Sequence, residues 1–468
     1  MRSDRTRNTT PWLLLAALLC APLALRAEVL LQHQPLISLS SPRSIAVGDF
    51  DEDGHLDLVV ASTHSNAIST LVGDGMGNFS TPTVHAAGST AQQVVKGDFN
   101  NDGHLDVAIA NFVGGAVTVA LGNGDGTFAA ATDFPAGTLS TSVAVADFNE
   151  DGNQDLVVAN HGSSTLTVLS GDGLGGFVTP TVFPVVNFPS FVTTGDLNGD
   201  NHADLVVSSS LDSNFNVMLG DGLGGFPQSS TYYLGQDDSI WSMELCDVNL
   251  DGNLDLVTPC PLGNAVAVFL GVGNGALLTP SIFPTGVYPK SSVVRDFDDD
   301  GLPDIAVVNN AGNSLALLLG DGTGFFSNPV AFVTGPGGVH VACGDFDEDG
   351  RCDLVAAHGQ SGALRAFLNR SEKPVHAPFR RGDADGDGNV AIPDAVHLLT
   401  RLFVVTQPAI CPDAADANDD GVINIGDAFV VLSYLFNADF PPVPAPGPMN
   451  CGMDLVIDPL PDCEVACP

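Results

Sequence analysis

Seven acidic segments share the pattern Asp-x-Asp/Asn-x-Asp-Gly-x-x-Asp, and they are the residues of this chain whose types and spacing could do chemistry. They open at Asp49, Asp98, Asp147, Asp196, Asp247, Asp296 and Asp345. When such a segment curls, side-chain oxygens at positions 1, 3, 5 and 9 and the carbonyl at position 7 point at one centre, and glycine at position 6 permits the turn. An oxygen-only set with several carboxylates is typical of Ca²⁺, because Mg²⁺ prefers fewer protein ligands and more water. The pattern therefore predicts about seven calcium sites.

The predicted ligands occupy the same positions in every copy. The first loop offers the side chains of Asp49, Asp51, Asp53 and Asp57 and the carbonyl of His55. The corresponding residues of the other loops are Asp98, Asn100, Asp102, His104 and Asp106; Asp147, Asn149, Asp151, Asn153 and Asp155; Asp196, Asn198, Asp200, His202 and Asp204; Asp247, Asn249, Asp251, Asn253 and Asp255; Asp296, Asp298, Asp300, Leu302 and Asp304; and Asp345, Asp347, Asp349, Arg351 and Asp353. The fourth loop has Asn201 in place of glycine. Because asparagine tolerates the left-handed region, we expect this loop to bind calcium as well, more weakly.

The loops recur at intervals of 49, 49, 49, 51, 49 and 49 residues, which indicates one structural unit repeated along the chain. In the unit from Gln92 to Ser140, apolar runs predict strands over 93–97, 107–110, 116–121 and 128–136, with the acidic loop after the first. A Gly-rich turn precedes the last strand. Four short strands per unit are typical of a propeller blade.

The two ends of the repeat array predict how it closes. The Gly-rich turn and outer strand occur six times, whereas the seventh repeat stops at 367–369 without them. Residues 28–38 precede the first repeat and have the right length to supply the missing strand. We therefore expect a mainly β protein with a closed seven-bladed β-propeller over residues 28–371, in which closure removes free sheet edges. An open solenoid is the alternative.

The overall charge excludes two classes of partner. The chain has 15 Lys+Arg against 55 Asp+Glu, a formal net charge of -40, whereas nucleic acid and anionic lipid both require Lys/Arg clusters. A hydrophobic content of 44% and regular apolar runs exclude disorder. The acidic residues concentrate at fixed offsets in the repeats, which favours cation binding over a role in solubility alone.

Residues 1–27 predict a secretory signal peptide, because arginines precede an apolar run over 12–25 that is short for a membrane span. Cleavage after Ala27 fits this reading. Cys20 leaves a lipoprotein anchor as an alternative, although Leu19 is large for the residue before such a cysteine. We expect a secreted, extracellular or cell-surface protein without a membrane span. Export permits disulfides, but their pairing cannot be deduced from sequence. The cysteines outside the signal are Cys246, Cys260, Cys343, Cys352, Cys411, Cys451, Cys463 and Cys467.

A different module follows the repeats. An acidic loop opens at Asp383 and has Asp394 at its twelfth position, and an amphipathic stretch with helical spacing follows. The pattern recurs from Asp416 to a helix that ends near Phe436. Two loop–helix units of this length predict a small α-helical domain. The chain after the repeats thus divides into a linker, this domain and a Pro- and Cys-rich tail, over residues 372–381, 382–440 and 441–468.

The repeats resemble FG-GAP/VCBS repeats, the blade unit of integrin alpha-chain propellers and of many secreted bacterial proteins. The resemblance covers about residues 28–371 and rests on the acidic motif and on a Gly-rich turn that ends in a phenylalanine. Those phenylalanines are Phe79, Phe128, Phe177 and Phe226, and the fifth turn departs from the pattern with Leu277. The resemblance implies that the calcium loops join the first and second strands of each blade on one face and that the opposite face carries ligand contacts.

The C-terminal pair of loops resembles a type I dockerin, a calcium-binding module that binds cohesin domains in cellulase assemblies. The resemblance implies two calcium ions held by Asp383, Asp385, Asp387, Asn389 and Asp394, and by Asp416, Asn418, Asp420, Val422 through its carbonyl, and Asp427. The Ser-Thr pair that usually recognises the partner is replaced by Ile392-Pro393 and Ile425-Gly426. This departure leaves the partner open, cohesin-like or another cell-surface molecule, and the expectation is a stable calcium-loaded adaptor.

A further set of residues stands five positions after each loop-closing aspartate, at the end of the second strand. They are Ser62, Asn111, Asn160, Ser209, Cys260, Asn309 and His358. In a closed ring they would form a circle at the face opposite the calcium loops, where all but the cysteine are candidates for a polar collar that contacts a glycan or peptide. The alternative is that serine and asparagine cap the strand end and start the turn, and we favour this alternative.

The sequence favours a binding or adhesion scaffold over an enzyme. Catalysis requires an acid, base or nucleophile that is not already a metal ligand or a turn residue, and neither the three lysines nor the scattered histidines form such a constellation. The predicted function is a calcium-binding propeller that presents a surface to a glycan or protein ligand, with a dockerin-like adaptor. The alternative is a polysaccharide-degrading lyase or hydrolase, or an accessory subunit of such a complex.

Overall fold

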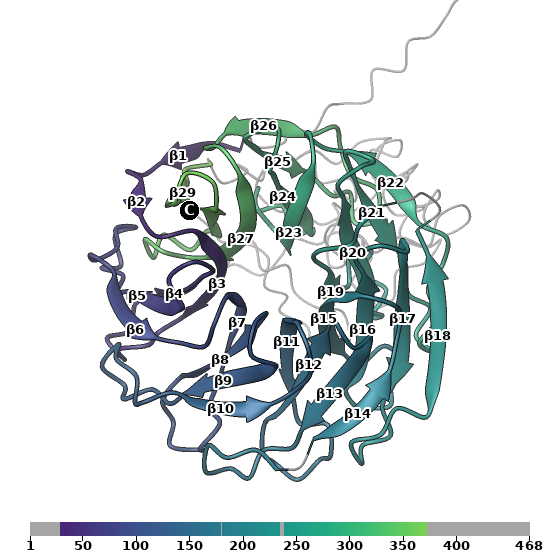
Figure 1. The fold of residues 1–468 in the computed structure, drawn as a ribbon. Helices are drawn as coiled ribbons and strands as arrows, with labels where there is room; N and C mark the ends of the chain where they lie inside the picture. The colour runs from purple at the N-terminus through teal and green to yellow at the C-terminus, as the bar shows by residue number, and fades with distance from the viewer. Residues whose placement is uncertain (1–28, 179, 235–237, 372–468) are drawn as a thin grey trace, which may run out of the picture. The chain divides into compact units, whose positions relative to one another are not determined.

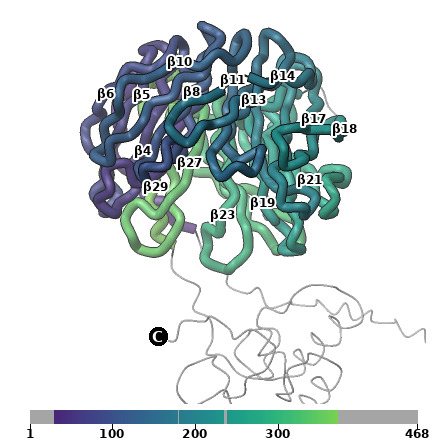
Figure 2. The backbone as a smooth tube through the Cα atoms, turned by 90° about the horizontal axis from the view of Figure 1, so that it is seen from below, coloured from purple at the N-terminus to yellow at the C-terminus, as the bar shows by residue number. Residues whose placement is uncertain are grey.

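The computed structural model describes residues 29–178, 180–234 and 238–371, which form seven antiparallel β-sheets around a central axis (Figure 1). Figure 2 shows the same ring edge-on. The predicted seven-bladed propeller is confirmed, and the open solenoid is excluded. The predicted signal peptide, linker, dockerin-like domain and tail lie outside the described residues.

The innermost strands contact one another around the axis. They are β3 (Pro42–Gly48), β7 (Ala91–Gly97), β11 (Ser140–Ala146), β15 (Pro189–Gly195), β19 (Glu244–Cys246), β23 (Pro289–Arg295) and β27 (Gly338–Gly344). The second strands are buried along their whole length because sheets cover both of their faces, which explains their near-continuous apolar runs. They are β4 (Asp57–Ser62), β8 (Asp106–Asn111), β12 (Asp155–Asn160), β16 (Asp204–Ser209), β20 (Asp255–Cys260), β24 (Asp304–Asn309) and β28 (Asp353–His358).

The two outer positions of each blade complete the sheets. The third strands are β5 (Ala67–Leu71), β9 (Ala116–Ala120), β13 (Thr165–Leu169), β17 (Asn214–Leu219), β21 (Ala265–Phe269), β25 (Ser314–Leu318) and β29 (Ala363–Asn369). The outer strands of the first six blades are β6 (Thr83–Ala86), β10 (Thr132–Pro135), β14 (Thr181–Pro184), β18 (Gln228–Tyr233), β22 (Ser281–Pro284) and β26 (Val330–Val333). The outer strands are mostly exposed, as expected for the rim of the ring.

The Gly-rich turn holds each blade to the one before it. In the second blade the Phe128 ring packs edge-on against Phe50 of the first blade, with ring centroids 6.0 Å apart, and Gly126 N–H donates to the Phe50 carbonyl at 2.9 Å. The outer strand predicted to start at Phe128 is therefore shorter and begins at Thr132. Phe128 instead forms an isolated bridge to Gly122, which fixes the turn.

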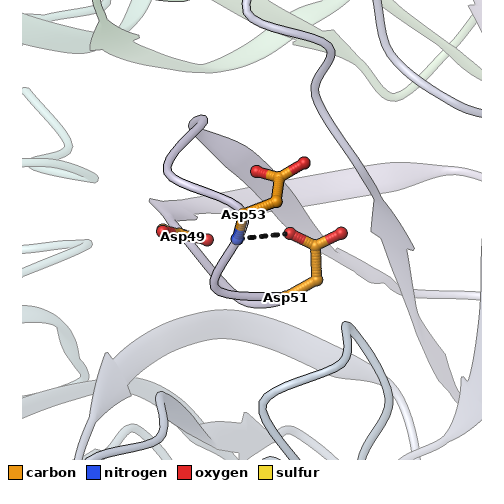
Figure 3. Close-up of side chains that lie close together, drawn as sticks. All are labelled: Asp49, Asp51 and Asp53. Atoms are coloured by element: carbon orange, nitrogen blue, oxygen red, sulfur yellow. Dashed lines mark hydrogen bonds between the residues drawn. The ribbon is translucent and has the colours of Figure 1, made fainter.

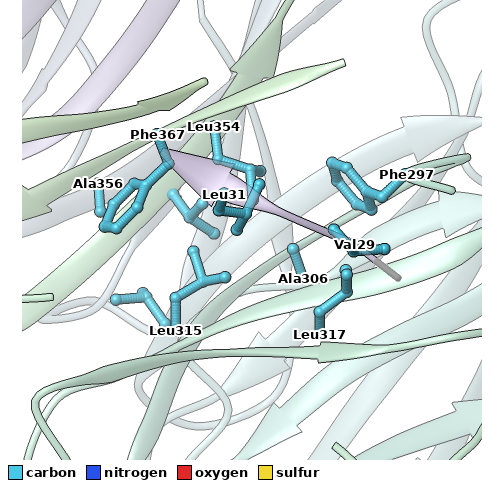
Figure 4. Close-up of a cluster of buried hydrophobic side chains, with 11 residues drawn as sticks. Val29, Leu31, Phe297, Ala306, Leu315, Leu317, Leu354, Ala356 and Phe367 are labelled. Atoms are coloured by element: carbon cyan, nitrogen blue, oxygen red, sulfur yellow. The ribbon is translucent and has the colours of Figure 1, made fainter. Parts of the chain in front are cut away.

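The N-terminal segment closes the ring as the outer strand of the seventh blade. Strand β1 (Leu31–His33) pairs antiparallel with β29, and β2 (Ile37–Ser38) continues the pairing. Figure 4 shows Val29 and Leu31 buried in a hydrophobic cluster with Phe297 of the sixth blade. Val29 thus contributes to the blade junction that a turn phenylalanine, or Leu277 in the fifth blade, fills elsewhere. The predicted closure is confirmed, and it joins the two ends of the described chain.

Candidate functional site

All seven acidic loops follow an innermost strand and share one hydrogen-bond frame. In the first loop Gly54 N–H donates to the Asp49 carboxylate at 3.0 Å, and Gly54 has a φ of 93°. Asn201 takes the same role in the fourth loop, with a φ of 66° and a 2.8 Å bond to Asp196. The corresponding bond is present in the other five loops. The turn predicted at position 6 is therefore present in every copy, including the one without glycine.

Three loops gather carboxylates closely enough to hold one cation between them. In the first loop, oxygens of Asp49, Asp51 and Asp53 lie within 4.8 Å of one another, as Figure 3 shows. Asp49 Oδ1 is buried and has no hydrogen-bond partner. Clustered carboxylates repel one another at this range unless a cation lies between them. The donor set and the orphaned oxygen fit the Ca²⁺ that the sequence predicts at this loop, and Asp49, Asp51 and Asp53 would hold it.

The sixth and seventh loops form comparable groups that differ in their third member and in the charges around them. The sixth brings together Asp296, Asp298 and Asp300, and the seventh brings together Asp345, Asp347 and Asp353. In the seventh loop two guanidinium groups pair with aspartates of the loop, one of which, Asp347, belongs to the close group. Arg351 pairs with Asp349 at 2.8 Å, and Arg370 pairs with both Asp349 and Asp347. Arginine charge therefore already neutralises part of the seventh loop.

The second to fifth loops carry asparagine at position 3 and so have one carboxylate fewer. In the second loop the Asn100 amide N–H donates to Asp102 at 2.7 Å, while its oxygen accepts the Asp102 N–H at 3.1 Å. The fourth and fifth loops repeat the side-chain bond. These loops keep the predicted oxygens in place with less negative charge, so they fit a more weakly held cation than the first loop does.

The aspartate at position 9 has a structural task in every blade. In the third blade, buried Asp155 accepts the Phe148 N–H at 3.0 Å and the Gly171 N–H at 2.8 Å, one on each oxygen. Burial raises the pKa of Asp155 to about 6. Asp57, which the sequence groups with the first loop's ligands, is bonded in the same way and lies outside that loop's close group. Position 9 therefore ties the loop to the end of the third strand.

The histidines at position 7 link neighbouring blades. Each ring nitrogen Nδ1 lies at hydrogen-bond distance from a glutamate at position 4 of the loop before it. The pairs are His55 with Glu348, His104 with Glu52, and His202 with Glu150. The hydrogen bond to the glutamate raises the pKa of each histidine. These side chains therefore form bonds between loops, and the one between His55 and Glu348 crosses the ring closure.

The candidate collar residues are buried inside the blades. The Asn160 amide N–H donates to Thr167 at 2.9 Å and its oxygen accepts the Ser140 hydroxyl at 3.0 Å. Ser209 donates to the Asn187 carbonyl at 2.8 Å. The same burial applies to the remaining candidates Ser62, Asn111, Asn309 and His358. These side chains therefore offer no exposed polar collar, and the bonds of Asn160 and Ser209 agree with the alternative role at the strand end.

Sequence reasoning missed a pocket at the mouth of the central channel, on the face opposite the acidic loops. The pocket has a volume of about 250 Å³ and is lined by residues that stand six positions before each loop, including Arg43, Trp241 and Lys290. The sequence could have identified these lining residues, because they stand six positions before the first aspartate of every acidic loop. Alternation along the strand did not predict that they face the axis, because a β-bulge changes which side chains do so.

The described cysteines Cys246, Cys260, Cys343 and Cys352 are free thiols. In the described part of the chain, no helix has the length and apolar character that a membrane span requires. The dockerin-like ligands from Asp383 to Asp427 lie outside the described residues, so their predicted calcium sites stay predictions.

Comparison with known proteins identifies the repeat. The FG-GAP-like repeat matches residues 49–109, 98–158, 147–207, 196–258 and 296–356, together more than half of the chain. No curated protein matches the sequence. A chain in the crystal structure of BBS1N in complex with ARL6DN, soaked with lead, is 14% identical with a TM-score of 0.54, over 74% of this chain and 99% of that one. A protein from Lactobacillus plantarum is 19% identical with a TM-score of 0.51, over 65% of this chain and 89% of its own. At these identities the likeness shows the fold alone.

Proposed function

This chain belongs to the FG-GAP-like repeat family, and from that premise we propose that it is a secreted calcium-binding propeller that acts as a binding scaffold for a glycan or protein ligand. The propeller itself fits a non-enzymatic binding role. The observation that carries the proposal is the shared frame of the seven acidic loops, with three close groups of carboxylates among them. A cation in these loops would stabilise one face of the ring and leave the opposite face for a ligand.

Calcium would act as a structural ion in this proposal. Ca²⁺ supplies a hard positive charge to several oxygens at once, and the chain positions those oxygens through the bond between positions 1 and 6. The first loop, with three clustered carboxylates and an orphaned buried oxygen, is the strongest candidate. The second to fifth loops, with asparagine at position 3, would bind more weakly.

The two ends of the chain would have separate roles in this function. Residues 1–27 would direct export, and the dockerin-like segment over 382–440 would attach the propeller to a cohesin-like or other cell-surface partner. The protein would then hold its ligand at the cell surface or in a secreted assembly. A strong net negative charge of -40 fits extracellular partners other than nucleic acid.

Glycan and protein arrays probed with the full chain, in calcium and in excess chelator, test the binding role. We expect calcium-dependent capture of a restricted set of ligands. A parallel incubation with acidic polysaccharides tests the enzyme alternative, because a lyase would release ultraviolet-absorbing unsaturated ends. Release of such ends, or of reducing ends by hydrolysis, would show that the protein is an enzyme and not a binding scaffold. An array without any calcium-dependent ligand would count against the binding role.

A further inference from the structure

A β-bulge recurs at the same place in six of the innermost strands. In β3 the register passes from Pro42 paired with Ser62 to Ser44 paired with Ala61, so Arg43 is the extra residue. The same shift occurs in the strands β7, β11, β15, β23 and β27. Bulges re-aim a side chain and are frequent beside functional sites. Here the extra residues line the mouth of the central channel, and they are Arg43, Gln92, Thr141, Ser190, Lys290 and Val339.

The pocket concentrates positive charge in a strongly acidic protein. Arg43 and Lys290 both line it, and among the described residues neither forms an ion pair; the Lys290 ammonium lies 4.3 Å from the centre of the Trp241 ring. Burial, followed by the charge of Arg43, lowers the pKa of Lys290 to about 8. The pocket lining contains no aspartate or glutamate. Two cations therefore share a half-buried space without a counter-charge from the lining.

Three ring nitrogens in the same pocket also lack partners. Trp241 Nε1, His161 Nδ1 and His340 Nδ1 are buried and form no hydrogen bond in the described structure. Burial, with a smaller effect of Arg43, lowers the pKa of His340 to about 4, so its ring is neutral at pH 7. Buried polar groups usually have a partner. The described chain therefore leaves three nitrogens of the pocket-lining side chains without a partner.

We propose that this pocket binds a carboxylated sugar residue of the hexuronate type, with its carboxylate between Arg43 and Lys290. The planar guanidinium forms paired hydrogen bonds with a carboxylate. The rings of Phe112 and Phe191 offer apolar faces to the sugar ring, and the unpartnered nitrogens offer hydrogen bonds to its hydroxyls. At about 250 Å³ the pocket accommodates a single terminal residue and not a run of them. The inference rests on the proposed binding role, whose ligand class it names, and is independent of the calcium loops.

Fluorescence of Trp241 provides the test. Trp12 and Trp241 are the two tryptophans of the chain, so the full chain carrying Trp12→Phe reports on the pocket alone. This protein, saturated with calcium, is titrated with glucuronate and galacturonate, with glucose and galactose as neutral counterparts, and with inorganic sulfate. Arg43→Gln and Lys290→Gln remove one cation each. Lys96→Gln is the matched control, because Lys96 lies on innermost strand β7, near its loop end, and donates to the Val47 carbonyl.

The expected result is saturable binding of a uronate, absent for the neutral sugars, and weaker by about tenfold or more in Arg43→Gln and Lys290→Gln but unchanged in Lys96→Gln. Arg43→Lys should retain part of the affinity, which separates lost charge from lost folding. Equal binding of neutral sugars, equal binding of sulfate, or an unaffected Arg43→Gln variant would each overturn the proposal. If the arrays give calcium-dependent ligands while uronates fail to bind, the proposed uronate pocket is wrong and the proposed binding role stands. Uronate binding without any calcium-dependent ligand on the arrays would support the pocket and contradict the calcium dependence of the binding role.

Discussion

At the scale of single residues, the acidic loops divide their carboxylates between two tasks, although Asp353 at position 9 of the seventh loop also belongs to the close group. Positions 1, 3 and 5 gather negative charge, as Asp49, Asp51 and Asp53 do. Position 9 is buried and accepts two backbone N–H groups, as Asp155 does. A substitution at position 5 should therefore affect metal affinity, and one at position 9 should affect folding itself.

Asp155→Ala tests this division, with Asp151→Ala in the same loop as its control. The first change leaves two buried N–H groups unsatisfied, at a cost of about 1–3 kcal/mol each. We expect Asp155→Ala to lower the free energy of unfolding of the metal-free protein by about 2–5 kcal/mol. Asp151 is exposed, so its loss should stay within about 0.5 kcal/mol without metal. Denaturant unfolding measures both, and equal effects would contradict the division.

His358 should make the protein sensitive to acid. The side chain is fully buried at a position that holds asparagine in the second, third and sixth blades. Burial, with a contribution from the charge of Arg365, lowers the pKa of His358 to about 4. Its folded pKa is below the unfolded value near 6.5, so its contribution to stability is present above pH 6.5 and is lost as the pH falls toward 4. The loss is on the order of 3 kcal/mol.

The substitution His358→Asn should remove this part of the acid sensitivity, because the amide does not titrate. The free energy of unfolding of the variant, followed from pH 7 to pH 4, should fall less steeply than that of the parent protein. His64→Asn, at an exposed position in the first blade, is the control and should leave the slope unchanged. Parallel pH curves for parent and His358→Asn would show that the buried imidazole carries no such penalty.

At the scale of elements, the short β1 strand performs the closure of the ring. Its partner β29 would otherwise be a free edge, and edges of this kind invite pairing with other chains. The strand has only three residues, so its anchoring depends on side chains more than on backbone pairing. Leu31 is 6% exposed within the cluster that includes Phe297, whereas the preceding Leu30 is 59% exposed.

Leu31→Ala should therefore destabilise the propeller by about 2–5 kcal/mol, the usual cost of truncating a buried leucine. Leu30→Ala should change stability by less than about 0.5 kcal/mol. Thermal unfolding and limited proteolysis near residue 31 would measure the difference between these adjacent positions. If both variants melt like the parent, the ring does not depend on the N-terminal strand for its stability.

At the scale of the whole molecule, calcium should determine how stable the ring is. At free calcium tenfold above the dissociation constant, each site adds about 1.4 kcal/mol, so seven sites would add roughly 10 kcal/mol. That sum is comparable with the stability of a whole domain. Calorimetry in calcium and in excess chelator should show a strong drop in melting temperature on chelation. A melting curve that does not respond to chelator would show that calcium does not stabilise the ring.

The C-terminal segment should fold separately from the ring. A domain of about 55–60 residues has a small core, so metal binding should be coupled to its folding. Asp383→Ala or Asp416→Ala removes the first predicted ligand of one of its loops, and either variant should lose helical signal and protease resistance within residues 382–436. The propeller transition in the same samples is the internal control and should not move. An equal shift of both transitions would mean that the two regions unfold as one unit.

The sequence by itself determined the features that repeat locally. The 49-residue spacing, the glycine or asparagine at position 6 and the spare segment before the first repeat predicted the blades, the loop turns and the closing strand, because each depends on short-range pattern or on chain length. Features of this kind can be predicted without knowing how neighbouring blades pack. The third-strand anchor of Asp155 was not visible, because its partner Gly171 is sixteen residues away and a recurring glycine in a turn does not reveal which side chain its backbone N–H contacts.

Only the tertiary structure decided what faces the channel. Arg43 and Lys290 are 247 positions apart, and they line one pocket because the ring closes. Alternation along a strand predicts which side chains share a face, but one extra residue in β3 moves the following side chains to the other face. The contact between Glu348 and His55 likewise exists only after closure. Contacts of this kind depend on register and ring geometry, which the local pattern does not record.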